Sequence, residues 1–175
     1  MFTLQTTYNQ KALTVMARAL RKTLRKRHSI LTRIFTSALI AVFILFVASY
    51  FLIGEAGENI FTLAFYIGTI VILSLIMLME DNLNGWIAGK QMLPNAREAQ
   101  TFFEADSYTN ATAAVKSICS YEQIKVICET KEYIVFFLSK KHGQVFDKKG
   151  FQNGDLQSFR TFIMDKVGKP IQYIK

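Results

Sequence analysis

IFTSALIAVFILFVASYFLI, residues 34–53, and IFTLAFYIGTIVILSLIMLM, residues 60–79, are the two stretches that decide the architecture of this chain. Neither contains a charged residue, and only residues 54–59 separate them. A helix rises about 1.5 Å per residue, so each stretch would be about 30 Å long, which is the thickness of the hydrocarbon core of a bilayer. The sequence therefore predicts a hairpin of two transmembrane helices.

The placement of charge around the two stretches predicts their orientation. Residues 1–33 carry eight Lys or Arg and no acidic residue, whereas residues 54–59 carry two glutamates and no base. Basic residues that flank a span stay on the cytoplasmic side of the membrane. We therefore expect a protein of the bacterial cell membrane with two spans, an external loop at Gly54–Asn59 and both termini in the cytoplasm.

The remaining sequence divides into a basic segment at residues 1–33, a linker at 80–96 and a small α+β domain at 97–175. Alternating apolar residues predict a short strand at Phe2–Tyr8, followed by an amphipathic helix that Asn9 caps. This helix either runs straight into the first span or bends near Ser29. Gly89 and Pro94 interrupt the linker, and Trp86 is expected to lie among the lipid headgroups.

After Arg97 the sequence is typical of strands. Candidate strands lie at residues 98–104, 112–119, 123–128 and 132–139, with turns at Thr130-Lys131 and Lys140–Gly143. A final helix carries Leu156, Phe159, Phe162, Ile163 and Val167, is capped by Asn153 or Asp155, and ends at Gly168. The strand at Phe2–Tyr8 could complete this sheet, in which case the domain would be split around the hairpin.

The order of residues after Glu98 resembles that of the YcxB-like family, bacterial membrane proteins found mostly in Gram-positive bacteria. The resemblance is carried by Tyr121-Glu122-Gln123-Ile124, the strand Tyr133–Leu138, the stretch Val145–Phe151 and a helix with Phe159 and Phe162. It implies a pleckstrin-homology-like (PH-like) domain, in which one helix closes a bent sheet. Members of the family often have a proline where this chain has Asp147. The resemblance implies no catalytic or ligand-binding residue.

Basic residues are the candidates for contacts with anionic lipid headgroups or with a partner, since each contributes about 1 kcal/mol near an anionic surface. An alternative is that the first group only sets the topology and that the second lies in solvated turns. The candidates form two groups: Arg18, Arg21, Lys22, Arg25, Lys26 and Arg27, then Lys140, Lys141, Lys148 and Lys149.

The sequence contains no arrangement typical of catalysis or of a metal site. Glu122, Glu129 and Glu132 are expected at the surface, and Glu80-Asp81 is expected to be a solvated helix end. His28 and His142 lack partners at ligand spacing. Cys119 and Cys128 are expected to be reduced thiols. We therefore expect no enzyme, no cofactor and no metal.

Three classes of function remain to be weighed. The favoured one is a membrane-anchored interaction or regulatory protein whose cytoplasmic domain binds a protein or a lipid. The alternative is an immunity protein that protects a Gram-positive bacterium against a membrane-active or secreted toxin. An enzyme is disfavoured, and so is a nucleic-acid partner. Small residues in the spans (Ala38, Ala41, Ala48 and Gly68) would allow self-association.

Overall fold

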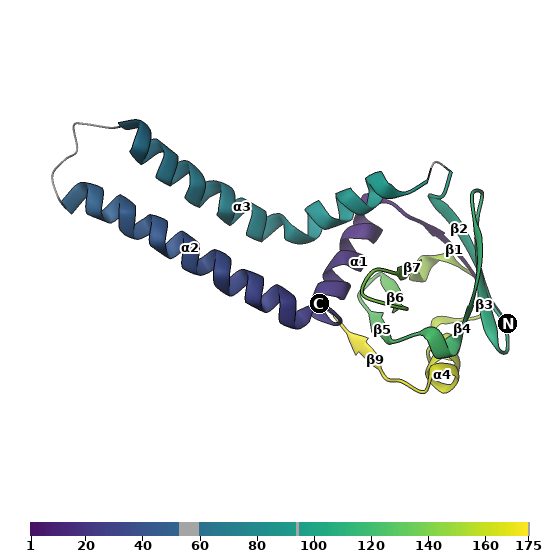
Figure 1. Ribbon diagram of the computed structural model, residues 1–175. Helices are drawn as coiled ribbons and strands as arrows, with labels where there is room; N and C mark the ends of the chain where they lie inside the picture. Colours follow the sequence, from purple (N-terminus) through teal and green to yellow (C-terminus); the bar gives the residue numbers. More distant parts are fainter. Residues whose placement is uncertain (53–59, 94, 175) are drawn as a thin grey trace. The chain divides into compact units, whose positions relative to one another are not determined.

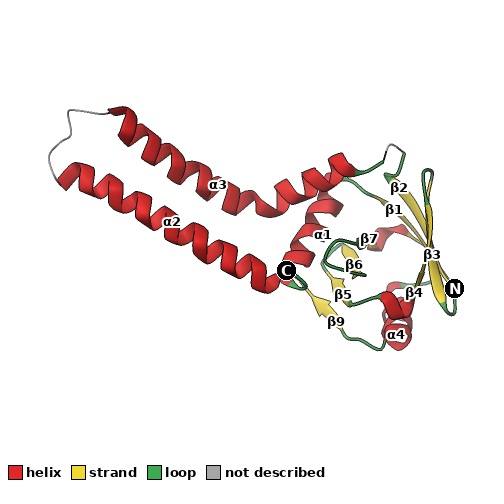
Figure 2. Ribbon diagram, viewed as in Figure 1, coloured by secondary structure: helices red, strands yellow, loops and turns green. Residues whose placement is uncertain are grey.

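The computed structural model describes residues 1–52, 60–93 and 95–174. The fold is α+β, and the chain forms two compact units, one joining Met1–Lys26 to Asp81–Lys175 and the other consisting of Arg27–Glu80. Figures 1 and 2 show the helices and strands. In chain order these are β1 (Phe2–Thr7), α1 (Gln10–Lys22), α2 (Lys26–Leu52), α3 (Ile60–Gln91), β2 (Glu98–Phe103), β3 (Ser107–Thr112), β4 (Lys116–Ser120), β5 (Val126–Glu129), β6 (Tyr133–Phe137), β7 (Gly143–Asp147), β8 (Phe151–Asn153), α4 (Leu156–Val167) and β9 (Ile171–Tyr173).

The two apolar stretches form α2 and α3, and both helices are long and apolar enough to cross a membrane. Tyr66 of α3 lies against Phe43 and Phe46 of α2, with ring centroids 5.9 and 5.5 Å apart. The outer side chains are exposed, for example Phe35 at 70% and Phe61 at 82%. Acyl chains of a lipid bilayer would remove such an apolar surface from water. The predicted loop at Gly54–Asn59 lies outside the described residues.

Both long helices extend beyond the apolar stretches. α2 begins at Lys26, and α3 continues to Gln91, so most of the segment predicted as a linker is helical. Gly89 does not end α3, because a single glycine inside a helix costs only about 1 kcal/mol. Between α1 and α2 the helix is interrupted at Thr23–Arg25, earlier than the predicted bend, and the Thr23 hydroxyl donates to the carbonyl of Ala19 at 2.7 Å.

The strand predicted near the N-terminus joins the first sheet, whose order is β4-β3-β2-β1-β8. β1 pairs antiparallel with β2 in a register that places Phe2 opposite Phe103 and Thr7 opposite Glu98. Its other edge pairs with β8. Figure 1 shows β1, drawn in purple, beside β2, which is drawn in teal. The sheet is therefore assembled from segments on both sides of the hairpin in the sequence.

The second sheet has the order β7-β6-β5-β9, and its last strand runs parallel to β5. The core holds the buried residues of both sheets together with α4, and aromatic rings dominate it. Phe103 meets Phe159 of α4 edge to face at 4.8 Å, and Phe136 meets Phe146 at the same distance. A second cluster packs Leu13 and the other apolar residues of α1 against Val135 and Val145 of the second sheet.

The helix predicted near the C-terminus is α4, and its ends follow the sequence signals. Oδ1 of Asp155 accepts from the backbone N–H groups of Gln157 and Ser158, at 2.8 and 2.9 Å. Asn153, the alternative cap, lies in β8. Gly168 adopts φ +66°, the left-handed conformation that glycine accepts without strain.

The strand prediction at 112–119 was wrong, and β3 and β9 were not predicted. The candidate strand at 112–119 is the end of β3, a turn held by the Thr112 hydroxyl, and most of β4. β3 was missed because its inward position Asn110 is polar; Asn110 is 8% exposed and its Oδ1 accepts from the Thr101 hydroxyl at 2.9 Å. β9 was missed because three residues carry too little periodicity.

The fold predicts that β1 is essential to the stability of the domain. Leu4 is fully buried in β1, which lies between β2 and β8 in the first sheet. Leu4→Ala should reduce the free energy of unfolding by about 3 kcal/mol, because it leaves a cavity. The measurement is the urea dependence of thiol labelling in the full chain, since Cys128 is fully buried and burial raises its pKa to about 11.

Thr7→Ala, at an exposed position of the same strand, is the matched control and should change stability by less than about 0.5 kcal/mol. Equal urea midpoints for Leu4→Ala and Thr7→Ala would show that β1 does not contribute to the core.

Candidate binding groove

The C-terminal part of α3, from Asp81 to Gln91, belongs to the same compact unit as α1. The two helices approach so closely at Gly85 that a Cβ atom there would lie 2.7 Å from the backbone nitrogen of Thr14. One turn later, a Cβ at Gly89 would lie 3.2 Å from Cδ1 of Leu13. Glycines spaced by four residues thus give α3 a flat face on which α1 packs.

An ion-pair network fixes the same contact between α1 and α3. Arg21 donates to both carboxylate oxygens of Asp81 at 2.7 Å, and Arg18 donates to the same group at 3.4 Å. The Gln10 side chain donates to the carbonyl of Asn82 at 3.1 Å. Asp81, expected to be a solvated helix end, is therefore engaged, and its side chain is only 14% exposed. Glu80 pairs with Arg33 at 3.3 Å within the hairpin unit.

The structure gives the predicted basic residues of the N-terminal segment different roles. Arg18 and Arg21 bind Asp81, and the Arg25 guanidinium donates to the carbonyl of Lys140 at 2.7 Å. Lys22, Lys26 and Arg27 are exposed. Arginines that hold elements together are less available to a ligand, so this segment is not a single uniform patch.

The four predicted lysines near β7 do not converge on one site. Lys140 and Lys141 precede β7 and Lys148 and Lys149 follow it, so the two pairs lie at opposite ends of a strand about 16 Å long. Lys148 is already bound: its ammonium group contacts Glu129 and donates to the carbonyl of Thr130 at 2.6 Å. Lys140, Lys141 and Lys149 are exposed.

Glu129, expected at the surface, is 2% exposed and anchors α4 to the second sheet. Arg160 of α4 donates from Nε to Oε2 at 2.9 Å and from Nη2 to Oε1 at 2.5 Å. Burial alone would raise the pKa of Glu129, but the hydrogen bonds from Arg160 and Lys148 outweigh burial and hold that pKa below its usual range. Both oxygens of this carboxylate are therefore bonded, and Glu129 has a structural role. Glu122 is exposed, and Glu132 pairs with Lys11 at 2.5 Å.

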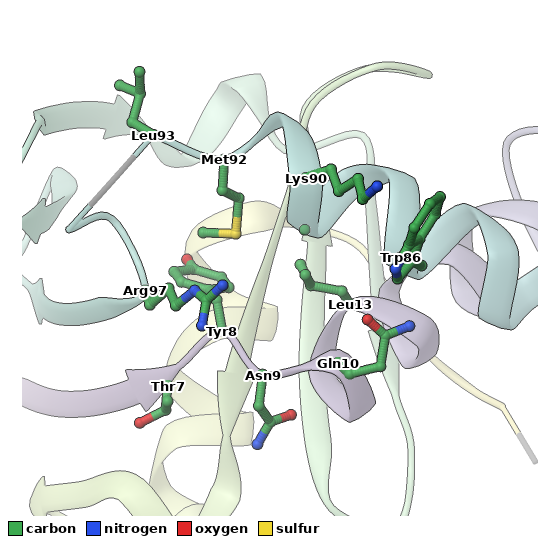
Figure 3. A pocket seen from close by; sticks show the side chains of 11 residues that line it. Thr7, Tyr8, Asn9, Gln10, Leu13, Trp86, Lys90, Met92, Leu93 and Arg97 are labelled. Carbon is green, nitrogen blue, oxygen red and sulfur yellow. The ribbon is translucent and has the colours of Figure 1, made fainter.

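A groove of about 680 Å³ lies beside the contact of α1 and α3. Figure 3 shows its side chains, which come from the β1–α1 junction, the last turns of α3, the two residues that follow α3, and Arg97 just before β2. Lys90 and Arg97 bring positive charge, and the Lys90 ammonium lies 3.9 Å from the centre of the Trp86 ring. Thr7, Asn9 and Gln10 add polar groups, and Leu13, Met92 and Leu93 add apolar surface.

Tyr8 links the groove to the core of the domain. Its backbone N–H donates to the carbonyl of Arg97 at 2.7 Å, which places Arg97 beside the β1–α1 junction. Its hydroxyl accepts from Asn110 at 3.4 Å, and its side chain is 9% exposed. Burial raises the pKa of Tyr8 despite the hydrogen bond from Asn110, so the phenol stays protonated.

Sequence reasoning identified one residue of the groove, Trp86, and missed the groove itself. Its lining comes from three segments that are distant in the sequence, at residues 7–13, 86–93 and 97. The only available signal was a pair of basic residues, Lys90 and Arg97, close to an interfacial tryptophan. In the part of the chain that the structure describes, no three His, Cys, Asp or Glu side chains are grouped to hold a metal ion. Cys119 and Cys128 are both buried free thiols.

Comparison with known proteins identifies one family. Residues 103–163 match the family described as YcxB-like protein, which confirms the resemblance seen in the sequence over this part of the chain. The matched range runs from the end of β2 into α4 and includes Glu129, Lys148 and Arg160. It does not include the hairpin or the groove. No curated protein and no solved structure matches the chain.

The cluster around Glu129 predicts a specific dependence of stability on pH. A carboxylate whose pKa is lowered by folding stabilises the folded state above its unfolded pKa, about 4.3, and this contribution is lost as pH falls through the folded pKa. Glu129→Gln should therefore cost about 3 kcal/mol at pH 7 and flatten the loss of stability below pH of about 4.3. Urea unfolding as a function of pH measures both effects.

Glu122→Gln removes an exposed carboxylate and is the control, with a change below about 0.5 kcal/mol. If Glu129→Gln kept the pH dependence of the unsubstituted chain, the role assigned to this cluster would be wrong.

Proposed function

We propose that this protein, whose residues 103–163 match the YcxB-like family, is a non-enzymatic interaction or regulatory protein of the membrane. The hairpin anchors the chain, and the β-rich domain binds a protein or a lipid next to the bilayer.

The observation that carries this proposal is the insertion of the hairpin within the domain. β1 and α1 precede the hairpin, and the remaining strands follow it, yet β1 is paired on both edges with strands of the second group. Three residues separate α1 from α2, and α3 continues unbroken to Gln91. A domain attached through two such short connections stays at the membrane surface, which suits a protein that acts on ligands there.

The charge pattern supports an orientation with both termini in the cytoplasm of a bacterium. Eight basic and no acidic residues precede the first apolar stretch, and such flanks remain on the cytoplasmic side. The proposed domain type is PH-like. It is supported by two antiparallel runs of consecutive strands, β1–β4 with the hairpin inserted and β5–β7, followed by the helix α4 that covers the core.

A binding function is favoured over catalysis by the state of the polar groups. Among the described residues, the most buried carboxylate, Glu129, is held by two cations and has a lowered pKa. A general acid or base at neutral pH requires a pKa shifted toward 7, which is the opposite direction for a glutamate. The groove beside α3 instead combines cations, an aromatic ring and amide groups, which are recognition elements.

Site-specific photocrosslinking in native membranes tests the proposal. A photoreactive phenylalanine analogue replaces Leu93 in the groove or Ile118 on β4, which are 56% and 69% exposed. At least one of these positions should give a discrete adduct with a single protein or with lipid headgroups. The same analogue at Leu45, which is 68% exposed near the middle of the apolar stretch of α2, is the control and should label acyl chains only.

Adducts at Leu93 and Ile118 that were identical to those at Leu45 would contradict a binding function of the domain.

A further inference from the structure

We infer that the groove beside α3 binds the anionic, phosphate-bearing headgroup of a membrane lipid. This inference rests on the proposed function, because it names the ligand of the proposed binding domain. Four features carry it: the charge of the groove, its polar and aromatic lining, its size and its position along α3.

The charge of the groove is positive and uncompensated. Lys90 and Arg97 line it, and among the residues that the structure describes no acidic side chain does. Every ion pair described for this unit involves other residues: Arg18 and Arg21 with Asp81, Lys11 with Glu132, and Lys148 and Arg160 with Glu129. An arginine offers a planar fork of donors to phosphate oxygens and a lysine a compact cation, so this pair suits a phosphate group.

The remaining lining fits the rest of a lipid headgroup. The Asn9 and Gln10 side chains bring amide donors and acceptors that could bond the hydroxyl groups of a polar headgroup. Leu13, Met92 and Leu93 offer apolar surface for the glycerol end of a lipid. A volume of about 680 Å³ lies within the range of small-molecule sites, about 300–1,000 Å³.

The position along α3 favours a lipid over a soluble anion. Trp86 lies seven residues beyond Met79, the last residue of the apolar stretch, which is about 10 Å along a continuous helix. The headgroup layer extends about 5–8 Å beyond the hydrocarbon core on each side, so Trp86 follows the apolar stretch at a distance just beyond the outer edge of that layer. Tryptophan is enriched at the boundary between membrane and water. The groove is therefore expected at the outer boundary of the layer that holds the lipid phosphates.

Trp86 is the only tryptophan of the chain, so its fluorescence reports directly on the groove. The full chain in a neutral detergent is titrated with short-chain phosphatidylglycerol or with short-chain phosphatidylcholine. We expect a saturable change in Trp86 emission with the anionic lipid and none with the zwitterionic one. Native mass spectrometry of the same samples counts the retained lipid molecules independently of fluorescence.

The double variant Lys90→Gln/Arg97→Gln should bind phosphatidylglycerol about 30-fold more weakly, because each cation contributes about a fivefold factor near an anionic group. The control variant Lys140→Gln/Lys141→Gln loses the same charge from an exposed turn and should bind as the unsubstituted chain does. Protection of the Cys128 thiol, which is fully buried, confirms that each variant is folded.

A third titration, with sodium phosphate at constant ionic strength, distinguishes binding of the phosphate group of a lipid from binding of free phosphate. Saturation of the groove by phosphate alone, equal binding of the two lipids, or equal weakening in the two double variants would each overturn the inference. The proposed function would survive these results if photocrosslinking at Leu93 or Ile118 still captured a discrete protein.

Discussion

The pairing of β1 with β2 and β8 is the constraint on which the rest of the structure depends. It joins residues that precede the hairpin to residues that follow it, and Leu4, which the pairing buries, lies in the same core cluster as Phe103, Phe146 and Phe159. The segment that leads into β8 also lies close to β1. A Cβ atom at Gly150, the residue before β8, would lie 1.8 Å from the carbonyl oxygen of Gln5. The segments that precede and follow the hairpin consequently belong to one folded unit.

Ion pairs within the domain stabilise this arrangement. Asp81 holds Arg18 and Arg21 where α1 meets α3, and Glu129 holds Lys148 and Arg160 where α4 meets the second sheet. Removing one partner of a buried pair is costly because it leaves a charge without compensation. Several basic residues that the sequence offered as candidates for lipid or partner contacts, such as Arg21 and Lys148, therefore stabilise the fold, whereas Lys90 and Arg97, which the sequence analysis did not single out, line the groove.

Much of the fold could be predicted because it depends on local signals. The apolar stretches, the Asn9 and Asp155 caps, the buried strand β6 and the ends of α4 all follow from short patterns. The predictions failed where tertiary contacts decide. Asn110 is buried because Thr101 and Tyr8 bond it, Glu129 is buried because two cations neutralise it, and α3 continues through Gly85 because that glycine packs on Thr14. The groove could not be predicted, since three distant segments form it.

The central claim is that the domain is split around the hairpin, and cross-linking of the full chain in membranes tests it most directly. Gln5 and Gln100 are exposed partners in the register of β1 and β2, so Gln5→Cys/Gln100→Cys should be joined by a thiol reagent that spans about 5 Å. Gln5→Cys/Lys116→Cys places the second thiol three strands away, at about 14 Å, and should not be joined. Mass spectrometry of the digested protein should find the first cross-link and not the second. Absence of the first cross-link, or equal yields of the two, would contradict the account.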